Sequence, residues 1–173
     1  MSRACPTPAR RALPSVLLLV TTSGCFSTPD AADLVAEHER SGGRVREADA
    51  VAALVDYVGV VNQALRTGDT EALATMTAAG CPCRELVAFI DDSYADDAEL
   101  IGAFFDVGEL SVQGLSGRRA RVRAGVSVSA YDVRNRDGLV VGSEPAQRYV
   151  AVYTLRRRDD GAWRVVDVRE TER

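Results

Sequence analysis

The sequence predicts an α+β domain in which N-terminal helices pack on a curved antiparallel sheet of about four strands. Between residues 51 and 94, apolar residues recur at steps of three and four, which is typical of amphipathic helices. From residue 109 onward they alternate with polar residues, which is typical of strands that are buried on one face. Helices followed by strands with mostly short connections favour a domain whose helices cover one face of an antiparallel sheet.

Three helices are expected before the first strand. The first ends at Gly68, a residue type that commonly terminates helices, and Asp69 is positioned to cap a short second helix with Leu73 and Met76. The third begins after a cysteine pair. The first helix has an apolar stripe of Val51, Leu54, Val55, Val58, Val61 and Leu65, and the third carries Leu86, Phe89, Ile90 and Tyr94.

Four strands are expected after the helices, at residues 109–115, 118–133, 148–158 and 162–171. In the second of these, small and apolar residues from Ala120 to Ala130 alternate with a polar row that contains three arginines. The arginine row is interpreted as a solvated face, with an anion-binding strip as the alternative. A turn-rich insertion, residues 134–147, separates the second strand from the third, and "DDG" predicts a hairpin turn between the last two.

The N-terminus has the composition of a secretory signal. Arg3, Arg10 and Arg11 precede a short apolar run from Leu13 to Val20, which is too short to span a bilayer. Small residues follow, as they do before a cleavage site. We therefore expect residues 1–24 to be a signal peptide that directs the rest of the chain out of the cytoplasm.

The segment "TTSGC" resembles a bacterial lipobox, with Ser23 and Gly24 before Cys25 and with Thr22 as a departure from the usual leucine-like residue. The resemblance implies cleavage before Cys25 and its acylation, so the protein is expected on the extracytoplasmic face of the cell membrane, with the bilayer as a partner. We expect residues 25–48 to be the lipidated cysteine and a tether, broken at Gly42-Gly43, and residues 49–173 to be a single domain.

The overall charge and the motif content exclude several function classes. The formal net charge is −4, and the signal peptide carries three arginines and no acid, which leaves about −7 (−4 minus 3) for the processed chain. A net acidic chain without a basic patch argues against a nucleic-acid partner. The only histidine, His38, lies in the tether, and no phosphate-binding loop or metal-ligand spacing is present. We expect no metal and no cofactor.

Cys81 and Cys83 are the two cysteines that remain in the domain after Cys5 leaves with the signal and Cys25 is acylated. In an oxidising compartment we expect them to pair with each other. Residues two apart on a helix point in nearly opposite directions, so a bridge requires Cys81 to lie outside the helix that Pro82 begins. A structural disulfide is the main interpretation, and a reducible thiol switch is the alternative.

The stretch from residue 51 to 94 resembles a family of actinobacterial lipoproteins to which no activity is assigned. The similarity rests on Tyr57, Asn62, Thr67-Gly68-Asp69, the cysteine pair and Tyr94. That family more often spaces its cysteines as C-x-x-C, whereas this chain has C-P-C. The order of elements is also similar to the cone-shaped nuclear transport factor 2-like (NTF2-like), or cystatin-like, fold, which implies helices closing an apolar cavity over a curved sheet.

The expected function is non-catalytic: binding of a small apolar ligand, or of an envelope protein, by a membrane-anchored domain. One alternative is a cone-fold enzyme with isomerase-like or hydrolase-like acid–base chemistry, since such enzymes use buried acids and tyrosines. The other alternative is envelope thiol chemistry at the cysteine pair. The residues expected to line a pocket are Tyr57, Asp106, Tyr131, Tyr153 and Asp167.

Overall fold

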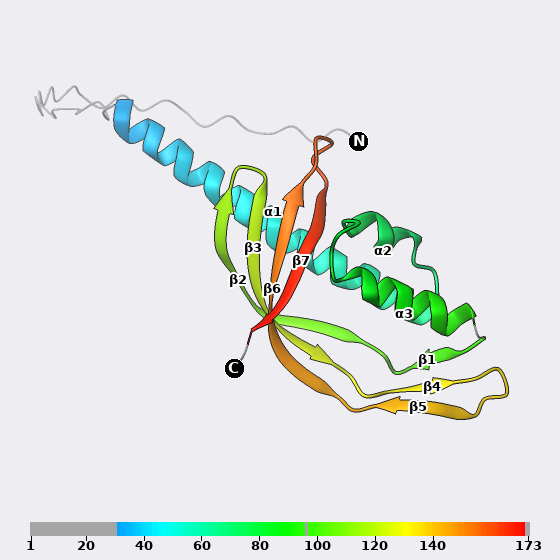
Figure 1. Cartoon of the computed structure of the whole chain (residues 1–173). Coiled ribbons are helices and arrows are strands. Elements are labelled where there is room, and N and C mark those ends of the chain that lie inside the picture. Colours follow the sequence, from blue (N-terminus) through cyan, green and yellow to red (C-terminus); the bar gives the residue numbers. More distant parts are fainter. Residues whose placement is uncertain (1–30, 96, 172–173) are drawn as a thin grey trace, which may run out of the picture.

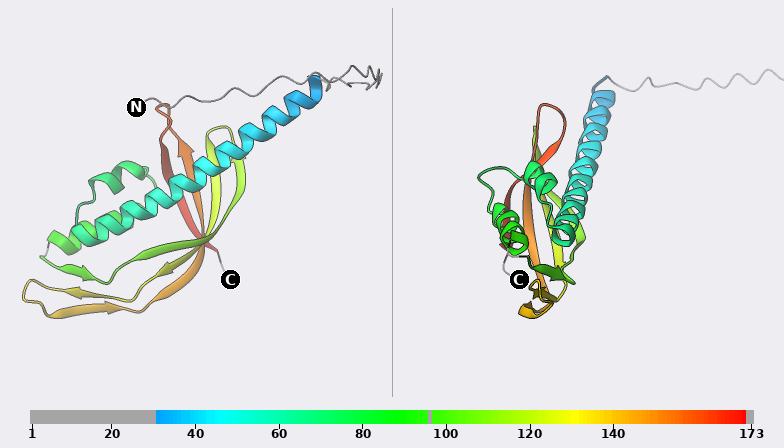
Figure 2. Two further views of the ribbon diagram at one scale, coloured as in Figure 1. Left: turned by 180° about the vertical axis from the view of Figure 1, so that it is seen from behind. Right: turned by 90° about the vertical axis from the view of Figure 1, so that its right-hand side faces the viewer.

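The computed structural model describes residues 31–95 and 97–171, and the side chains from residue 46 onward within those ranges. The signal peptide and Cys25 lie outside the described residues. Helices α1, α2 and α3 are followed by seven strands, and α1 crosses one face of an antiparallel sheet (Figures 1 and 2). The predicted α+β class, with helices first and a curved antiparallel sheet after them, is confirmed.

Helix α1 spans Ala31–Thr67, so it begins well before the predicted start at residue 49. It runs without interruption through Gly42-Gly43, and the break expected there is wrong. Each glycine costs only about 1 kcal/mol relative to alanine in a helix, and a helix that is already nucleated elongates one hydrogen bond at a time. The N-terminal part of α1 extends past the end of the sheet (Figure 1).

The second half of α1 is a core helix of the domain. Residues 46–67 are long and apolar enough to cross a membrane by length and composition alone. However, Leu54, Tyr57 and Val61 are each at most 3% exposed, and they belong to the core that α1 forms with the sheet. This packing accounts for the apolar character of the segment without a membrane span.

Helices α2, Glu71–Met76, and α3, Arg84–Ala95, lie beside the C-terminal half of α1 (Figure 1). Gly68 ends α1 with a φ of 74°, and its N–H donates to the carbonyl of Ala64 over 2.8 Å. Asp69 is one residue further from α2 than predicted, because Thr70 is the cap position, yet the Asp69 carboxylate accepts the Glu71 N–H at 3.1 Å. The three predicted helices are therefore all present.

The seven strands form two antiparallel sheets rather than one sheet of about four strands. The larger sheet has the order β2-β3-β6-β7 and the smaller one has the order β1-β4-β5. The strands are β1 Glu99–Ile101, β2 Phe105–Ser116, β3 Arg119–Val128, β4 Tyr131–Arg134, β5 Val140–Glu144, β6 Gln147–Arg157 and β7 Trp163–Thr171.

The smaller sheet continues the larger one across a bend. Strands β1 and β2, β3 and β4, and β5 and β6 follow one another along three bent paths through the centre of the molecule (Figure 1). The segment interpreted as a turn-rich insertion forms part of β4–β5, an antiparallel hairpin. Register shifts at Gly108/Ser111 and Val112/Gly114 in β2 mark bulges, which increase twist and curve a sheet.

Asn62 of α1 joins the helix to the first residue of β2. Its Nδ2 donates to the carbonyl of Phe105 over 2.8 Å, and its Oδ1 accepts the Phe105 N–H at 2.7 Å. One side chain thus satisfies both backbone groups of Phe105 where β2 begins. The hydrogen-bonded pair fixes the height of α1 above the sheet.

The hydrophobic core lies between α1 and the inner face of the larger sheet. On β3 the predicted alternation is confirmed, since Ala120, Val122, Ala124 and Val126 are all buried while Arg119 and Arg121 are exposed. The inner face of β6 continues this core with Ala151, Tyr153 and Leu155, which are at most 5% exposed.

Candidate functional site

A cavity of about 300 Å³ lies between α1, α3 and the inner face of the larger sheet. A volume of this size is at the lower end of the range for small-molecule sites. Helix α1, helix α3 and strands β2, β6 and β7 all contribute side chains to its walls. The lining residues are Tyr57, Val58, Val61, Pro82, Cys83, Glu85, Leu86, Phe105, Tyr149, Tyr153, Val168 and Glu170.

Tyr57 and Tyr153 form an aromatic pair in the wall of this cavity. Their ring centroids are 6.3 Å apart with an interplanar angle of 62°, an edge-to-face arrangement that aromatic rings favour. Tyr57 comes from α1 and Tyr153 from β6, so the pair also holds the helix against the sheet. The sequence analysis singled out both residues, and the structure brings them together.

Burial keeps the hydroxyls of this pair protonated. Desolvation raises the pKa of Tyr57 to about 12, with a hydrogen bond to Thr77 acting in the opposite direction. Desolvation likewise raises the pKa of Tyr153, and Tyr149 and Tyr57 add to the effect. At neutral pH these phenols are therefore hydrogen-bond donors in an apolar wall, and neither is a base.

The mouth of the cavity is more polar than its wall. Tyr149 is half-buried there, and desolvation, with the Glu170 carboxylate as a second cause, raises its pKa. Glu170 is exposed and belongs to the last strand. A carboxylate at the mouth disfavours an anionic ligand, so the charge pattern fits a neutral molecule with an oxygen acceptor for the tyrosine hydroxyls.

A second hollow of about 210 Å³ adjoins the first. It shares Leu86, Phe105, Tyr149 and Glu170 with the cavity, whereas Tyr131 lines only this second hollow. Tyr131 is therefore next to the predicted pocket and not in the same wall as the Tyr57–Tyr153 pair. Together the two hollows form an apolar groove that runs from α1 toward the smaller sheet.

The cysteine pair lies at the rim of the cavity. The sulfur atoms of Cys81 and Cys83 are at bonding distance, and their Cα atoms are 5.1 Å apart. The N–H of Arg84 donates to the carbonyl of Cys81 over 3.0 Å, so both cysteines lie in a turn that precedes α3. Cys81 is outside the helix, as the bridge requires, but α3 begins one residue after Cys83 and not at Pro82. The oxidised state of the pair in the cell stays a prediction.

Asp106 and Asp167 lie outside the cavity. Asp106 is exposed on β2 and lines a separate hollow with Phe104, Ser127 and Arg148 among its walls. Asp167 accepts a hydrogen bond from Arg169 Nε over 2.8 Å and lines none of the cavities described above. The structure thus does not bring either aspartate together with the buried tyrosines, as the acid–base alternative would need.

Of the residues that line the cavity, only Tyr57 and Tyr153 were predicted as pocket residues, and those missed include Leu86, Phe105, Tyr149 and Glu170. Phe105 and Tyr149 lie an even number of residues from the inward-facing residues of their strands, so strand periodicity could have found them. Glu170 could not be found in this way, because the register shift between Thr154 and Leu155 changes which β7 residues face inward. Among the described residues no group of three or more His, Cys, Asp or Glu side chains is arranged to hold a metal ion.

The architecture resembles solved structures of low sequence identity. The intermembrane space region of the chloroplast protein ARC6 aligns with a TM-score of 0.55 and 13% identity over 73% of this chain and 97% of that one. A protein with a cystatin-like fold from Caulobacter vibrioides aligns with a TM-score of 0.46 and 16% identity over 73% of this chain and 89% of that one. An NTF2-like protein with a cystatin-like fold from Novosphingobium aromaticivorans aligns with a TM-score of 0.43 and 19% identity over 82% of this chain and 89% of that one.

These likenesses concern the fold and extend to no activity. No protein-family model and no curated protein matches the sequence. The class that the architecture defines is an α+β domain with helices packed on curved antiparallel sheets, in which a cavity opens between α1, α3 and the larger sheet.

Proposed function

We propose that the protein is a membrane-anchored extracytoplasmic lipoprotein whose domain binds a small, neutral, largely apolar ligand. The observation that carries the binding proposal is the cavity of about 300 Å³ with the Tyr57–Tyr153 pair in its wall. The predicted lipobox at Cys25 supports the anchor. The similarity of residues 51–94 to actinobacterial lipoproteins agrees with this location and supplies no catalytic residue.

The chemistry of the wall supports binding over catalysis. Both buried phenols stay protonated at neutral pH. The Tyr57 hydroxyl is already hydrogen-bonded to Thr77, so the Tyr153 hydroxyl offers the donor to an ether, carbonyl or hydroxyl oxygen of the ligand. Val58, Val61 and Leu86 supply apolar contact around them. The two carboxylates that border the cavity, Glu85 and Glu170, are both exposed. A ligand with an apolar body and one or two oxygen acceptors fits this arrangement.

A titration with the neutral fluorescent probe N-phenyl-1-naphthylamine tests the binding proposal. The probe is apolar and uncharged, so binding reports on the cavity and not on charged surface. In the variant Leu86→Trp a larger ring fills the space that both hollows share, and we expect its affinity for the probe to fall about tenfold or more.

The matched control is Val55→Trp, because Val55 is 47% exposed on α1 and lines neither the cavity nor the hollow beside it. The control adds an equal ring without entering the cavity, and its affinity should stay within about twofold of the parent. Equal weakening in both variants, or no saturable binding by the parent protein, would contradict the proposal.

The anchor is tested separately. Cells that express the full chain should incorporate labelled palmitate into the protein, and the variant Cys25→Ser should not incorporate it. Recovery of an unlabelled parent protein from the cytosol would rule out the lipoprotein assignment and would leave the cavity measurement unaffected.

A further inference from the structure

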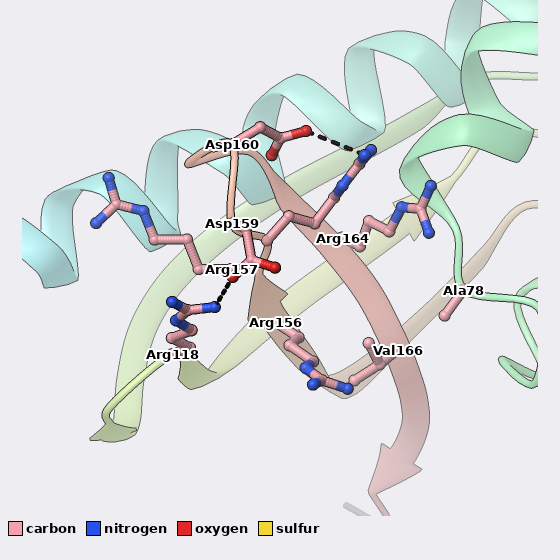
Figure 3. A pocket seen from close by; sticks show the side chains of 9 residues that line it. Ala78, Arg118, Arg156, Arg157, Asp159, Asp160, Arg164 and Val166 are labelled. Carbon is pink, nitrogen blue, oxygen red and sulfur yellow. Dashed lines mark hydrogen bonds and ion pairs between the residues drawn. The ribbon is translucent and has the colours of Figure 1, made fainter.

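Another hollow, of about 440 Å³, lies at the end of the larger sheet, away from the tyrosine cavity. Its polar side chains come from the β2–β3 turn and from both strands of the β6–β7 hairpin (Figure 3). Five arginines and two aspartates line it, which gives a local net charge of +3 in a chain whose net charge is −4. They are Arg118, Arg156, Arg157, Arg158, Arg164, Asp159 and Asp160, with Ala78 and Val166 as apolar neighbours.

The hairpin turn neutralises part of this charge. Arg118 is paired with Asp159, and Arg158 Nη2 lies 3.0 Å from an oxygen of Asp160. Arg157 donates from Nε to the carbonyl of Gly161 over 3.1 Å. Three guanidinium groups, those of Arg156, Arg157 and Arg164, have no carboxylate within ion-pair distance among the residues that the structure describes. Of these, Arg157 is held by the Gly161 carbonyl, which leaves Arg156 and Arg164.

Arg156 and Arg164 are direct partners in the β6–β7 register, and Arg119 is the partner of Arg156 on β3. Partners in an antiparallel pair lie on the same face of the sheet, so three arginines form one row across three strands. Like charges that oppose each other in this way destabilise a sheet. In addition, Nε of Arg164 is buried and has no hydrogen-bond partner in the described part of the chain.

We propose that this arginine hollow binds a phosphomonoester. A dianion between Arg156 and Arg164 would offset the repulsion of the row, and its oxygens would accept from the guanidinium forks, which suit phosphate in a bidentate geometry. Because Nε of Arg164 is buried, the phosphate oxygens would accept from the terminal Nη groups of its guanidinium. The hollow is larger than inorganic phosphate needs, and Ala78 and Val166 offer apolar contact to the organic part of an ester.

The phosphomonoester has two sources that share this chemistry, a soluble phosphorylated molecule and the headgroup of a lipid. The β2–β3 turn and the β6–β7 turn, which line the hollow, lie at the end of the sheet toward which the N-terminal part of α1 extends (Figure 1). The same end would face the bilayer if the segment before α1 is anchored at Cys25. The experiment therefore has one arm for each source.

The test uses the full chain purified in a nonionic detergent without phosphate. Calorimetric titrations with inorganic phosphate and glycerol 3-phosphate probe the soluble source, and mixed micelles with dioctanoyl phosphatidic acid probe the lipid source, with dioctanoyl phosphatidylcholine as the blank. The site variant is Arg156→Gln with Arg164→Gln. The control is Arg134→Gln with Arg136→Gln, which removes the same charge from the β4–β5 hairpin.

We expect the parent to bind at least one phosphomonoester, the site variant to bind it about tenfold or more weakly, and the control to stay within about threefold. Binding of only the micellar phosphatidic acid assigns the site to a headgroup, and binding of glycerol 3-phosphate assigns it to a soluble ester. Both results support the proposal.

Three results would overturn the proposal: no binding of any probe by the parent, equal weakening in both double variants, or unchanged binding in the site variant. The site variant should also unfold at the same temperature as the parent or higher in low salt without phosphate, because one like-charge pair is removed. If the double variant does not fold, the exposed single change Arg156→Gln carries the same test, with an expected loss of about fivefold.

Discussion

Asn62 is the residue whose replacement should most sharply test the contact between α1 and the start of β2. In Asn62→Ala the N–H and the carbonyl of Phe105 lose their partners at 2.7 and 2.8 Å. Each hydrogen bond contributes about 1 kcal/mol net, and part-buried backbone groups left unpaired add to the cost, so we expect a loss of about 2–4 kcal/mol. For a domain of this size the unfolding midpoint should fall by about 10 °C.

The assay is chemical and thermal unfolding of the parent and of two variants. The matched control is Asn135→Ala, since the Asn135 side chain also makes two hydrogen bonds to the backbone. It accepts two N–H groups, at 3.1 and 2.9 Å, near solvent in the β4–β5 turn. Water replaces those contacts, and the expected cost is about 1 kcal/mol or less. If Asn62→Ala is no more destabilising than Asn135→Ala, the side chain does not join helix and strand as described.

The variant Asn62→Asp gives the same contact a pH signature. It keeps the acceptor for the Phe105 N–H but places a second carboxylate oxygen against the Phe105 carbonyl, where the asparagine donates. Repulsion and partial burial should raise the pKa of the new carboxyl above the value of about 3.9 in the unfolded chain. The neutral acid donates as the amide does, so stability is fully present below pH 3.9 and is lost as pH rises through the raised pKa. A flat pH dependence relative to the parent would refute the geometry.

Three further predictions concern the cysteines, a buried phenol and the end of α1. Replacing Cys81 and Cys83 together with serine should cost at most about 1.6 kcal/mol, because the closed loop is so short, and should leave the circular dichroism spectrum unchanged. Tyr57 should contribute up to about 1.4 kcal/mol per pH unit to the fall in stability between pH 10 and 12, where the unfolded chain ionises this residue and the folded chain does not, and Tyr57→Phe should reduce the slope by that amount in unfolding titrations. Gly68→Ala should cost more than about 2 kcal/mol by the same measurement, because a Cβ at that φ of 74° would lie 2.5 Å from the ring of Tyr94.

Local periodicity predicted the helices and the longest strands correctly. The apolar stripe of α1, apart from Val55, which is 47% exposed, and the alternation on β3 each reflect one buried face, and a sequence records that directly. Gly68 and the "DDG" turn were also found, because a φ above zero restricts the residue type, and both Gly68 and Gly161 adopt one. The smaller sheet was missed because β1 and β5 are too short for a period of two to stand out.

The site was only partly predictable because it depends on strand register. Tyr57 and Tyr153 were expected in one pocket and are in contact there, whereas Asp106 faces outward from the strand that supplies Phe105. The pairing of Arg156 with its partner on β7 follows from a register that no single strand reveals. The register of β7 against β6 shifts once, at a bulge that follows Val165. Alternation counted from Val165 therefore assigns the later residues of β7, such as Glu170, to the wrong face.

The most direct test of the central claim is where a neutral apolar probe binds. Intermolecular nuclear Overhauser effects should be measured between N-phenyl-1-naphthylamine and the full chain in deuterated detergent. We expect contacts from the probe to the rings of Tyr57, Phe105 and Tyr153, which line the same cavity. Contacts confined to exposed apolar residues such as Phe104 or Leu139, with none to those three rings, would contradict it.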